Sequence, residues 1–335
     1  MLESRAMTKR ERVMAALGRR RVDRPPVAFW RHVPHLDHDP RQLATAMLEF
    51  HRRFDLDLIK LMSSGVYCVE DWGCDVAYTG EPNGAKRCTR HAVQGPADWA
   101  SIRPLDPGAG ALGRELEALR VTVQGRHDDA PVLHTIFSPL TIARKLAGER
   151  LERDLVHSPE RVLAAVEIIA HTVARYAAAA MAAGADGLFL ATQVANAEAV
   201  PESDWARAGE PFLASLVETL APTCPILLMH LHGQKVYFDK VAALPVHAIN
   251  WHDRLTEPTL GDGKRRFAGA VVGGLDEWQT LRTGSVDEVV RETLEAIAQT
   301  QGTGLIVAPG CVLPLDVPDT SLDSVVRTVK SVSAA

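Results

Sequence analysis

The amino-acid sequence predicts an α/β fold, a (β/α)8 TIM barrel. From residue 131 onward, short apolar runs alternate with longer segments of helical periodicity, which is the pattern of parallel strands joined by crossover helices. Side chains capable of chemistry follow several of the apolar runs, as expected where all strands end at one mouth. No Gly-x-Gly-x-x-Gly motif opens the first helix, which disfavours a doubly wound sheet. We therefore expect one domain over residues 1–335.

The N-terminal part is predicted to be an extension that leads into the first strand of the sheet. A helical pattern over residues 8–17 ends at Gly18, an extended segment spans residues 27–30, and a second helix spans residues 40–53. The first strand follows at residues 56–61. Residues 62–125 have an irregular, glycine-punctuated pattern, which predicts a long insertion or lid after this strand.

The remaining elements follow from hydrophobic periodicity. Apolar runs predict strands at residues 132–137, 187–191, 224–230, 247–251, 268–273 and 304–308. Helical spacing predicts helices at residues 140–147, 159–183, 209–220, 235–243, 286–299 and 318–332. The glycine-rich stretch at residues 261–266 resembles a phosphate-binding loop in composition only, and we predict an ordinary loop there.

Composition restricts the class of protein. The formal net charge of −5 argues against a nucleic-acid partner, because phosphate binding requires clustered Lys and Arg. No uncharged apolar run approaches the roughly 20 residues that span a bilayer, so we expect no membrane segment. The charged N-terminus lacks a signal-peptide pattern, and five cysteines suit reduced thiols, so we expect a cytoplasmic protein. Barrels often associate through outer helices, which makes a homodimer a further expectation.

The most informative residues are His230, His232 and Cys311. Two histidines two residues apart at a strand end point to the same side, and Cys311 follows another strand. If the two strand ends meet, two imidazoles and a thiolate form a three-ligand site with one open position, which is the catalytic arrangement of Zn(II). These ligands suit zinc better than Mg(II) or Ca(II). The alternative is a core histidine pair beside an inert buried cysteine.

Other polar residues are predicted near the same mouth. Candidate catalytic residues are His134, Gln193 and Asp253, with a helix N-cap as the alternative use of Asp253. Candidate substrate contacts are Arg31, Lys60, Tyr67, Asp71, Trp72, Asn196, Trp251 and His252. Cys68, Cys74 and Cys88 are unevenly spaced, which favours free thiols over a second metal site.

Several short motifs together resemble the uroporphyrinogen decarboxylase superfamily, from about residue 8 to 332. They are Val22-Asp-Arg-Pro-Pro-Val27, Phe137-Ser-Pro-Leu-Thr141, Ala183-Gly-Ala-Asp186, Ile249-Asn-Trp251, Gly273-Gly-Leu-Asp276, Leu281-Arg-Thr-Gly284, Ala308-Pro-Gly-Cys311 and Asp316-Val-Pro318. This resemblance implies a (β/α)8 barrel.

Within this superfamily the chain departs from the true decarboxylases. Their Arg-Gln-Ala-Gly-Arg-Tyr segment is replaced by Trp30-Arg-His-Val-Pro34, and their late Gly-His-Gly is replaced by Gly310-Cys-Val312. Met62 or a neighbour stands where they have an aspartate, and a methionine cannot offset the positive charge that develops on a pyrrole. Decarboxylation of tetrapyrroles is therefore disfavoured.

The chain is more similar to the branch of zinc methyltransferases that move methyl groups between corrinoid proteins and thiols. That branch has His-x-Cys-Gly on one strand and a cysteine on the last. The chain keeps His230, Gly233 and Cys311 but has His232 in place of the first cysteine. The resemblance implies methyl transfer or demethylation with Zn(II), a small-molecule methyl donor or acceptor, and a corrinoid carried by a partner protein.

Two alternatives remain open from the sequence. The first is a metal-free lyase in the decarboxylase style, which holds a carboxylated substrate with Arg31 and Lys60. The second is a barrel subunit without catalytic activity that binds a corrinoid protein.

Overall fold

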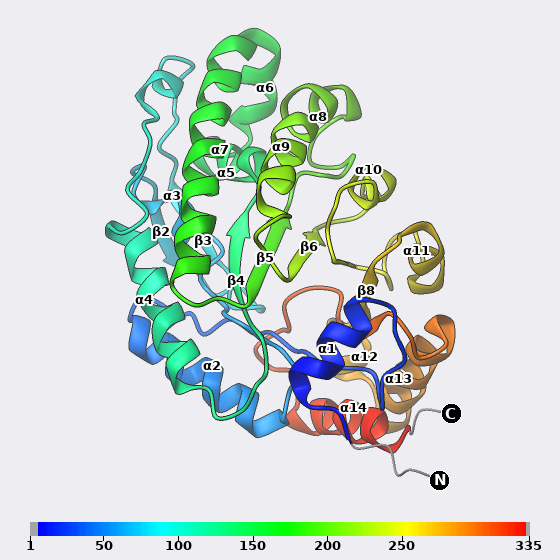
Figure 1. The fold of residues 1–335 in the computed structure, drawn as a ribbon. Helices are drawn as coiled ribbons and strands as arrows, with labels where there is room; N and C mark the ends of the chain where they lie inside the picture. The colour runs from blue at the N-terminus through cyan, green and yellow to red at the C-terminus, as the bar shows by residue number, and fades with distance from the viewer. Residues whose placement is uncertain (1–5, 333–335) are drawn as a thin grey trace.

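The computed structural model describes residues 6–332, which form a curled parallel sheet surrounded by helices (Figure 1). The sheet has seven strands in the order β1-β4-β5-β6-β7-β8-β9, and every pair is parallel. Their bounds are β1 Ile59–Lys60, β4 Val132–Phe137, β5 Gly187–Thr192, β6 Leu227–Leu231, β7 Ala248–Trp251, β8 Ala270–Leu275 and β9 Leu305–Pro309. The predicted α/β fold with a parallel sheet is confirmed.

The extended segment at residues 27–30 lies between the two edge strands. Val27 forms a parallel bridge with Val307 of β9, and the Ala28 amide donates to the Val307 carbonyl at 3.0 Å. On its other side, the Val27 carbonyl accepts from the Asp57 amide at 2.9 Å, just before β1. These bonds join both edges of the sheet, an arrangement consistent with a TIM-like barrel.

The helices cover the outside of the sheet. Their bounds are α1 Lys9–Leu17, α2 Pro40–Phe54, α5 Pro139–Ala147, α6 Arg150–His157, α7 Pro159–Ala182, α8 Glu202–Ala208, α9 Glu210–Leu220, α10 Phe238–Ala242, α11 Leu260–Arg266, α12 Thr280–Thr283, α13 Val286–Thr300 and α14 Asp319–Ser331. Capping boxes begin α1, at Thr8 and Glu11, and α13, at Ser285 and Glu288. The loop predicted at residues 261–266 is wrong: Thr259 caps α11 there by accepting from the Asp262 amide.

The insertion between β1 and β4 is more regular than predicted. It contains the short helix α3 Tyr67–Glu70, an antiparallel hairpin of β2 Asp75–Tyr78 and β3 Lys86–Arg90, the 3-10 helix η1 Asp98–Ser101, and α4 Gly110–Gly125. The last of these packs against α2 (Figure 1). The sequence signal for α4 is weak because it begins at a glycine without a side-chain cap.

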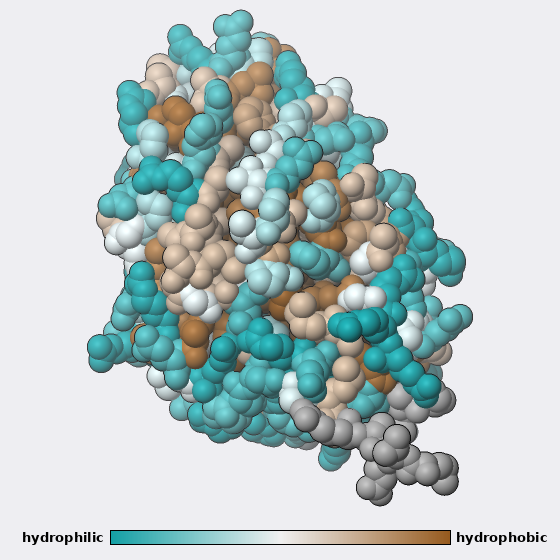
Figure 2. Space-filling model, viewed as in Figure 1, coloured by the Kyte–Doolittle hydropathy of each residue, from teal (hydrophilic) through white to brown (hydrophobic). Residues whose placement is uncertain are grey.

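One helix of the described residues, α7, is long and apolar enough to cross a membrane by length and composition, a property that the sequence analysis did not anticipate. It packs on β4 and on the neighbouring helices α5 and α9, and its Val and Ile side chains are largely buried. A strip of weakly hydrophobic surface follows part of this helix between charged residues (Figure 2). A core helix that covers a sheet has the same length and composition.

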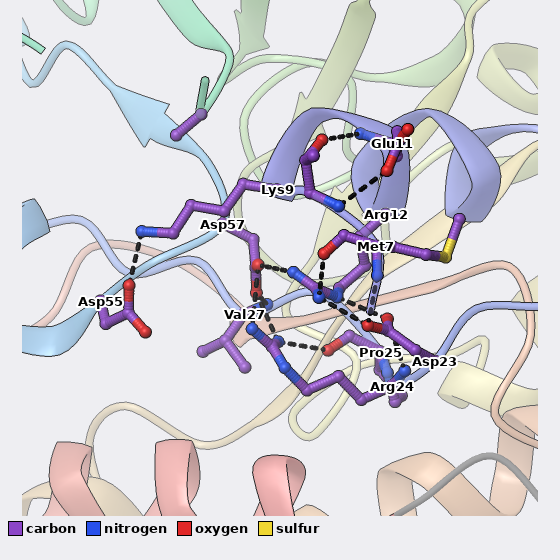
Figure 3. Close-up of polar contacts among 12 residues, drawn as sticks. Met7, Lys9, Glu11, Arg12, Asp23, Arg24, Pro25, Val27, Asp55 and Asp57 are labelled. Atoms are coloured by element: carbon purple, nitrogen blue, oxygen red, sulfur yellow. Dashed lines mark hydrogen bonds and ion pairs between the residues drawn. The ribbon is translucent and has the colours of Figure 1, made fainter. Parts of the chain in front are cut away.

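A buried ion-pair network fastens α1 and the following turn to the sheet (Figure 3). The carboxylate of Asp57 is fully buried and accepts from Arg12 at 2.7 Å, from Arg24 at 2.6 Å and from the Val27 amide at 2.8 Å. Arg12 also binds Asp23 through two bonds of 2.7 Å. Because Asp57 stands between the extended segment and β1, the network fixes the place where the sheet edges meet.

Candidate metal centre and active site

The ends of β6 and β9 bring His230, His232 and Cys311 together. Cys311 Sγ lies 3.7 Å from His230 Nε2 and 3.6 Å from His232 Nδ1. His230 is the fourth residue of β6, His232 directly follows the last residue of that strand, and Cys311 lies two residues beyond the end of β9. The predicted proximity of these three side chains is therefore observed.

A fourth donor belongs to the same cluster. His252 follows β7, and its Nε2 lies 3.4 Å from His232 Nδ1. The candidate ligand atoms of His230, His232, His252 and Cys311 all lie within 4.8 Å of one another. His252 was predicted to contact substrate, and the structure adds it to the group of metal-binding side chains.

Two buried polar residues orient the imidazoles. Asn250 on β7 donates through Nδ2 to the carbonyls of Val272 and Pro309, so its Oδ1 faces His230 Nδ1 at 2.6 Å as an acceptor. This bond places the proton of His230 on Nδ1 and leaves Nε2 free toward Cys311. Glu277 lies after β8, with Oε1 3.2 Å from His252 Nδ1. Such partners on the far nitrogen are typical of metal-binding histidines.

The cluster favours an ionised thiol. Burial by itself opposes ionisation of Cys311, but the charge and hydrogen bonds of the surrounding imidazoles outweigh it and hold the pKa of the thiol well below its usual range. Burial would likewise lower the pKa of His252, yet Cys311 and Glu277 raise it to about 10. A thiolate with neighbouring imidazole nitrogens is a donor set that fits Zn(II) and does not suit hard cations.

A small cavity of about 60 Å³ lies beside the cluster. Its lining includes His230, Cys311, Lys60 and Gln193, with Trp30 and Phe189 as aromatic walls. Lys60 is 5 % exposed, and burial lowers the pKa of its ammonium group to about 7. Lys60 and Gln193 are thus predicted site residues that the structure places next to the cluster.

Two of the three predicted catalytic residues lie elsewhere. His134 is fully buried and its Nε2 lies 2.8 Å from the hydroxyl of Tyr176 on α7, so it faces the helix layer. Asp253 accepts from the Gly274 amide at 3.0 Å, and burial raises its pKa to about 7. It does not cap a helix, and it does not line the cavity. The expectation that both side chains face the mouth of the barrel is wrong. A position on a strand or close to its end does not fix the direction in which the side chain points.

The predicted substrate contacts of the insertion have structural roles instead. Tyr67 donates to the Thr135 carbonyl at 2.6 Å, and Trp72 donates to the Arg103 carbonyl at 2.8 Å. Asp71 accepts from the Ala111 amide at 2.9 Å and so binds the first turn of α4. None of the three lines the cavity beside the cluster, so their predicted role as its cover is not supported.

Three further residues that were predicted to contact substrate also lie away from the cavity. Arg31 lies over the ring of Phe50 in a separate groove. Trp251 is fully buried and donates to the Pro258 carbonyl at 2.8 Å. Asn196 donates to the His232 carbonyl at 2.9 Å, so it positions the turn that carries His232.

The hairpin of the insertion contains a second group of metal-binding side chains. All five cysteines are free thiols, as expected. Candidate ligand atoms of Cys74, Cys88 and His91 nevertheless lie within 4.8 Å of one another, because β2 and β3 pair. The uneven spacing of the cysteines favoured free thiols over a second metal site, but the pairing of β2 and β3 still brings Cys74 and Cys88 close enough to share a metal ion.

Known proteins resemble the chain over nearly its whole length. The family described as uroporphyrinogen decarboxylase (URO-D) matches residues 8–332. The methylcobamide:CoM methyltransferase MtbA of Methanosarcina acetivorans is 21 % identical over 344 residues, which cover 97 % of this chain and 98 % of the relative. The methylcobamide:CoM methyltransferase MtaA of Methanosarcina barkeri (strain Fusaro) is 22 % identical over 325 residues, covering 91 % and 92 %.

Solved structures support the same fold. A methyltransferase from Methanosarcina mazei superposes with a TM-score of 0.81 at 20 % identity, covering 97 % of this chain and 98 % of that one. A B12-independent methionine synthase from Shewanella sp. W3-18-1 superposes with a TM-score of 0.59 at 13 % identity, covering 92 % of each chain. At these identities the likeness concerns the fold alone.

Proposed function

From the premise that the chain belongs to the uroporphyrinogen decarboxylase family, we propose that it is a zinc-dependent methyltransferase that uses a corrinoid-borne methyl group. The predicted transferase class is confirmed by relatives named methyltransferases. The observation that carries the finer proposal is the convergence of one thiolate and three imidazoles at the ends of β6, β7 and β9.

Four side chains of the cluster could hold the metal. Cys311 supplies the anionic sulfur, and His230 and His232 supply nitrogens at 3.7 and 3.6 Å from it. His252 is available as a further donor. Zn(II) bound there would act as a Lewis acid that lowers the pKa of a substrate thiol or polarises a methyl donor.

The chain's own residues prepare the site for this chemistry. Asn250 fixes the tautomer of His230, and Glu277 holds the ring of His252. Trp30 and Phe189 form apolar walls of the cavity, and apolar surroundings strengthen electrostatic interactions with a bound substrate. Gln193 is partly exposed at the cavity and can orient a polar substrate group.

A direct assay tests the proposal. The purified chain is mixed with methylcobalamin and a panel of small thiols, and demethylation of the corrinoid is followed by its absorbance while the methyl thioether is identified by mass spectrometry. We expect thiol-dependent methyl transfer that stops when zinc is removed by a chelator and returns when zinc is restored.

Release of carbon dioxide from a carboxylated substrate by the chelated protein would instead support the lyase. Arg31 does not line the cavity, which leaves the lyase hypothesis with Lys60 alone.

The partner of His252 gives a separate prediction. Glu277→Gln removes the charge beside Nδ1, so we expect zinc affinity to fall by roughly 10- to 100-fold. Competition with a chromophoric chelator measures this change. Glu292→Gln is the matched control, because Glu292 binds the Asp276 amide and the Thr280 hydroxyl and does not contact the cluster. Equal zinc affinity in wild type and Glu277→Gln would show that this carboxylate does not support a metal ligand.

A further inference from the structure

The open end of the β2–β3 hairpin brings two thiols and an imidazole together, apart from the metal-ligand cluster at the barrel mouth. Cys74 directly precedes β2, and His91 directly follows β3. Cys88 pairs with Val76, two residues after Cys74, and alternate residues of a strand face the same side. The candidate ligand atoms of Cys74, Cys88 and His91 lie within 4.8 Å of one another. None of these three residues lines the cavity beside the metal-ligand cluster.

Backbone groups hold these side chains in place. The carbonyl of Lys145, near the end of α5, lies 2.9 Å from His91 Nδ1 and 3.9 Å from Cys74 Sγ, so it orients the ring and the thiol together. The Ala92 amide donates to the same sulfur at 3.3 Å. The φ of Gly148 is +60°, and a Cβ there would lie 2.6 Å from His91 Nε2, so this glycine leaves room for the ring. Donors that are already positioned lower the cost of binding a metal ion.

The types of donor decide which class of ion fits the hairpin. Two sulfurs and one imidazole nitrogen disfavour Mg(II) and Ca(II), which prefer oxygen ligands. Among residues 6–332, no fourth Cys, His, Asp or Glu side chain belongs to this group, whereas structural Zn(II) sites use four protein ligands. Thiolates select Cu(I), and this ion is stable with three ligands. Cys88 and His91 are half-buried, so an ion can reach the group from solvent.

We propose that Cys74, Cys88 and His91 form a second metal site, which binds one Cu(I) ion through two sulfurs and one imidazole nitrogen. The ion replaces the thiol protons, which pass to solvent, and no group is oxidised or reduced. The bound ion links the two strands of the hairpin to each other. Because a ligand that binds only the folded state stabilises it, copper should also raise the thermal stability of the chain. The site is independent of the proposed methyl transfer.

Copper titration of the reduced, zinc-containing protein under anaerobic conditions tests the second site. Cu(I) is supplied as its bicinchoninate complex, whose absorbance falls when the protein removes the ion. We expect wild type to take up one Cu(I) ion per chain while its zinc content stays unchanged. A higher apparent melting temperature of the copper-loaded protein is the second readout.

Single substitutions identify the ligands. Because loss of even an outer partner typically lowers metal affinity 10- to 100-fold, we expect Cys74→Ala, Cys88→Ala and His91→Ala each to weaken Cu(I) binding by about 100-fold or more. Cys68→Ala is the matched control, because Cys68 is a buried free thiol of the same insertion that lies outside the group. It should bind Cu(I) like wild type. Circular dichroism confirms that each variant is folded.

The metal-ligand cluster also contains soft donors, and Cys311→Ala separates the two sites. If copper uptake is lost in Cys311→Ala but kept in Cys74→Ala, the ion enters the metal-ligand cluster and the second site is wrong. No uptake by wild type, or equal affinity in wild type and Cys88→Ala, would also overturn it. A second zinc ion in the purified protein that is lost in Cys74→Ala would overturn the choice of Cu(I). The corrinoid assay tests methyl transfer separately from all of these results.

Discussion

Cys311→Ala is expected to lower the rate of methyl transfer from methylcobalamin to a thiol by about a thousandfold, because Lewis-acid activation is worth several kcal/mol. Cys311 is the one anionic donor of the cluster and contacts both His230 and His232. Without the thiolate, the neutral imidazoles bind zinc weakly. The measurement is the initial rate of corrinoid demethylation at saturating thiol.

A second cysteine provides the control for this result. Cys224 is also buried, but its thiol donates to the Ile226 carbonyl at 3.2 Å and lies outside the cluster. Cys224→Ala should keep a rate near that of wild type. A Cys311→Ala protein that retains both zinc and most of its activity would show that the thiolate is not a ligand.

Asp57→Ala is expected to destabilise the fold by about 3–5 kcal/mol, which is typical when one member of a buried ion pair is removed. Asp57 is fully buried and accepts from Arg12, Arg24 and the Val27 amide (Figure 3). Its removal leaves the Arg24 guanidinium without this carboxylate and frees the segment between the sheet edges. Urea denaturation followed by circular dichroism measures the loss.

A surface pair gives the matched comparison. Arg53 and Asp323 form two bonds of 2.9 Å, but their side chains are 48 % and 35 % exposed. Asp323→Ala should therefore cost less than about 1 kcal/mol. Similar losses for Asp57→Ala and Asp323→Ala would mean that the buried network does not hold the sheet edges together.

The order of the strands and helices could be predicted from hydrophobic periodicity. Buried strands such as β5 and β9 are largely apolar runs bounded by turn residues, and long helices such as α7 and α13 have clear apolar faces. The sequence pattern does not reveal the short helices α8 and α11. Each spans seven residues, which is too few for the helical repeat of apolar residues to be recognised.

The metal-ligand cluster was only partly predictable. The spacing of His230 and His232 is a local signal, and Cys311 follows a strand end, so the barrel geometry brings them together. The place of His252 in the cluster and the contact of Glu277 with it depend on the register of β7 and β8 against β6 and β9, which no local pattern reveals. A signal was nevertheless present, since His252 and Glu277 follow the ends of predicted strands.

The predicted site residues that lie away from the cavity share a physical explanation. Asp71 and Tyr67 were predicted to contact substrate from their position on the insertion, whose helices were not predicted, and both contact backbone groups of neighbouring elements. His134 was chosen for its strand, but alternate residues of a strand face opposite sides. Its side chain contacts Tyr176 on the helix side, while the adjacent Thr135 lines the cavity.

The zinc content of freshly purified, reduced protein is the most direct test of the central claim. We expect about one zinc ion per chain in wild type and almost none in His230→Ala or Cys311→Ala, because these side chains hold the metal. Elemental analysis by mass spectrometry, on proteins shown to be folded, gives the result. A wild-type protein that contains no zinc and takes up none on titration would contradict the proposal that this cluster is a zinc site for methyl transfer.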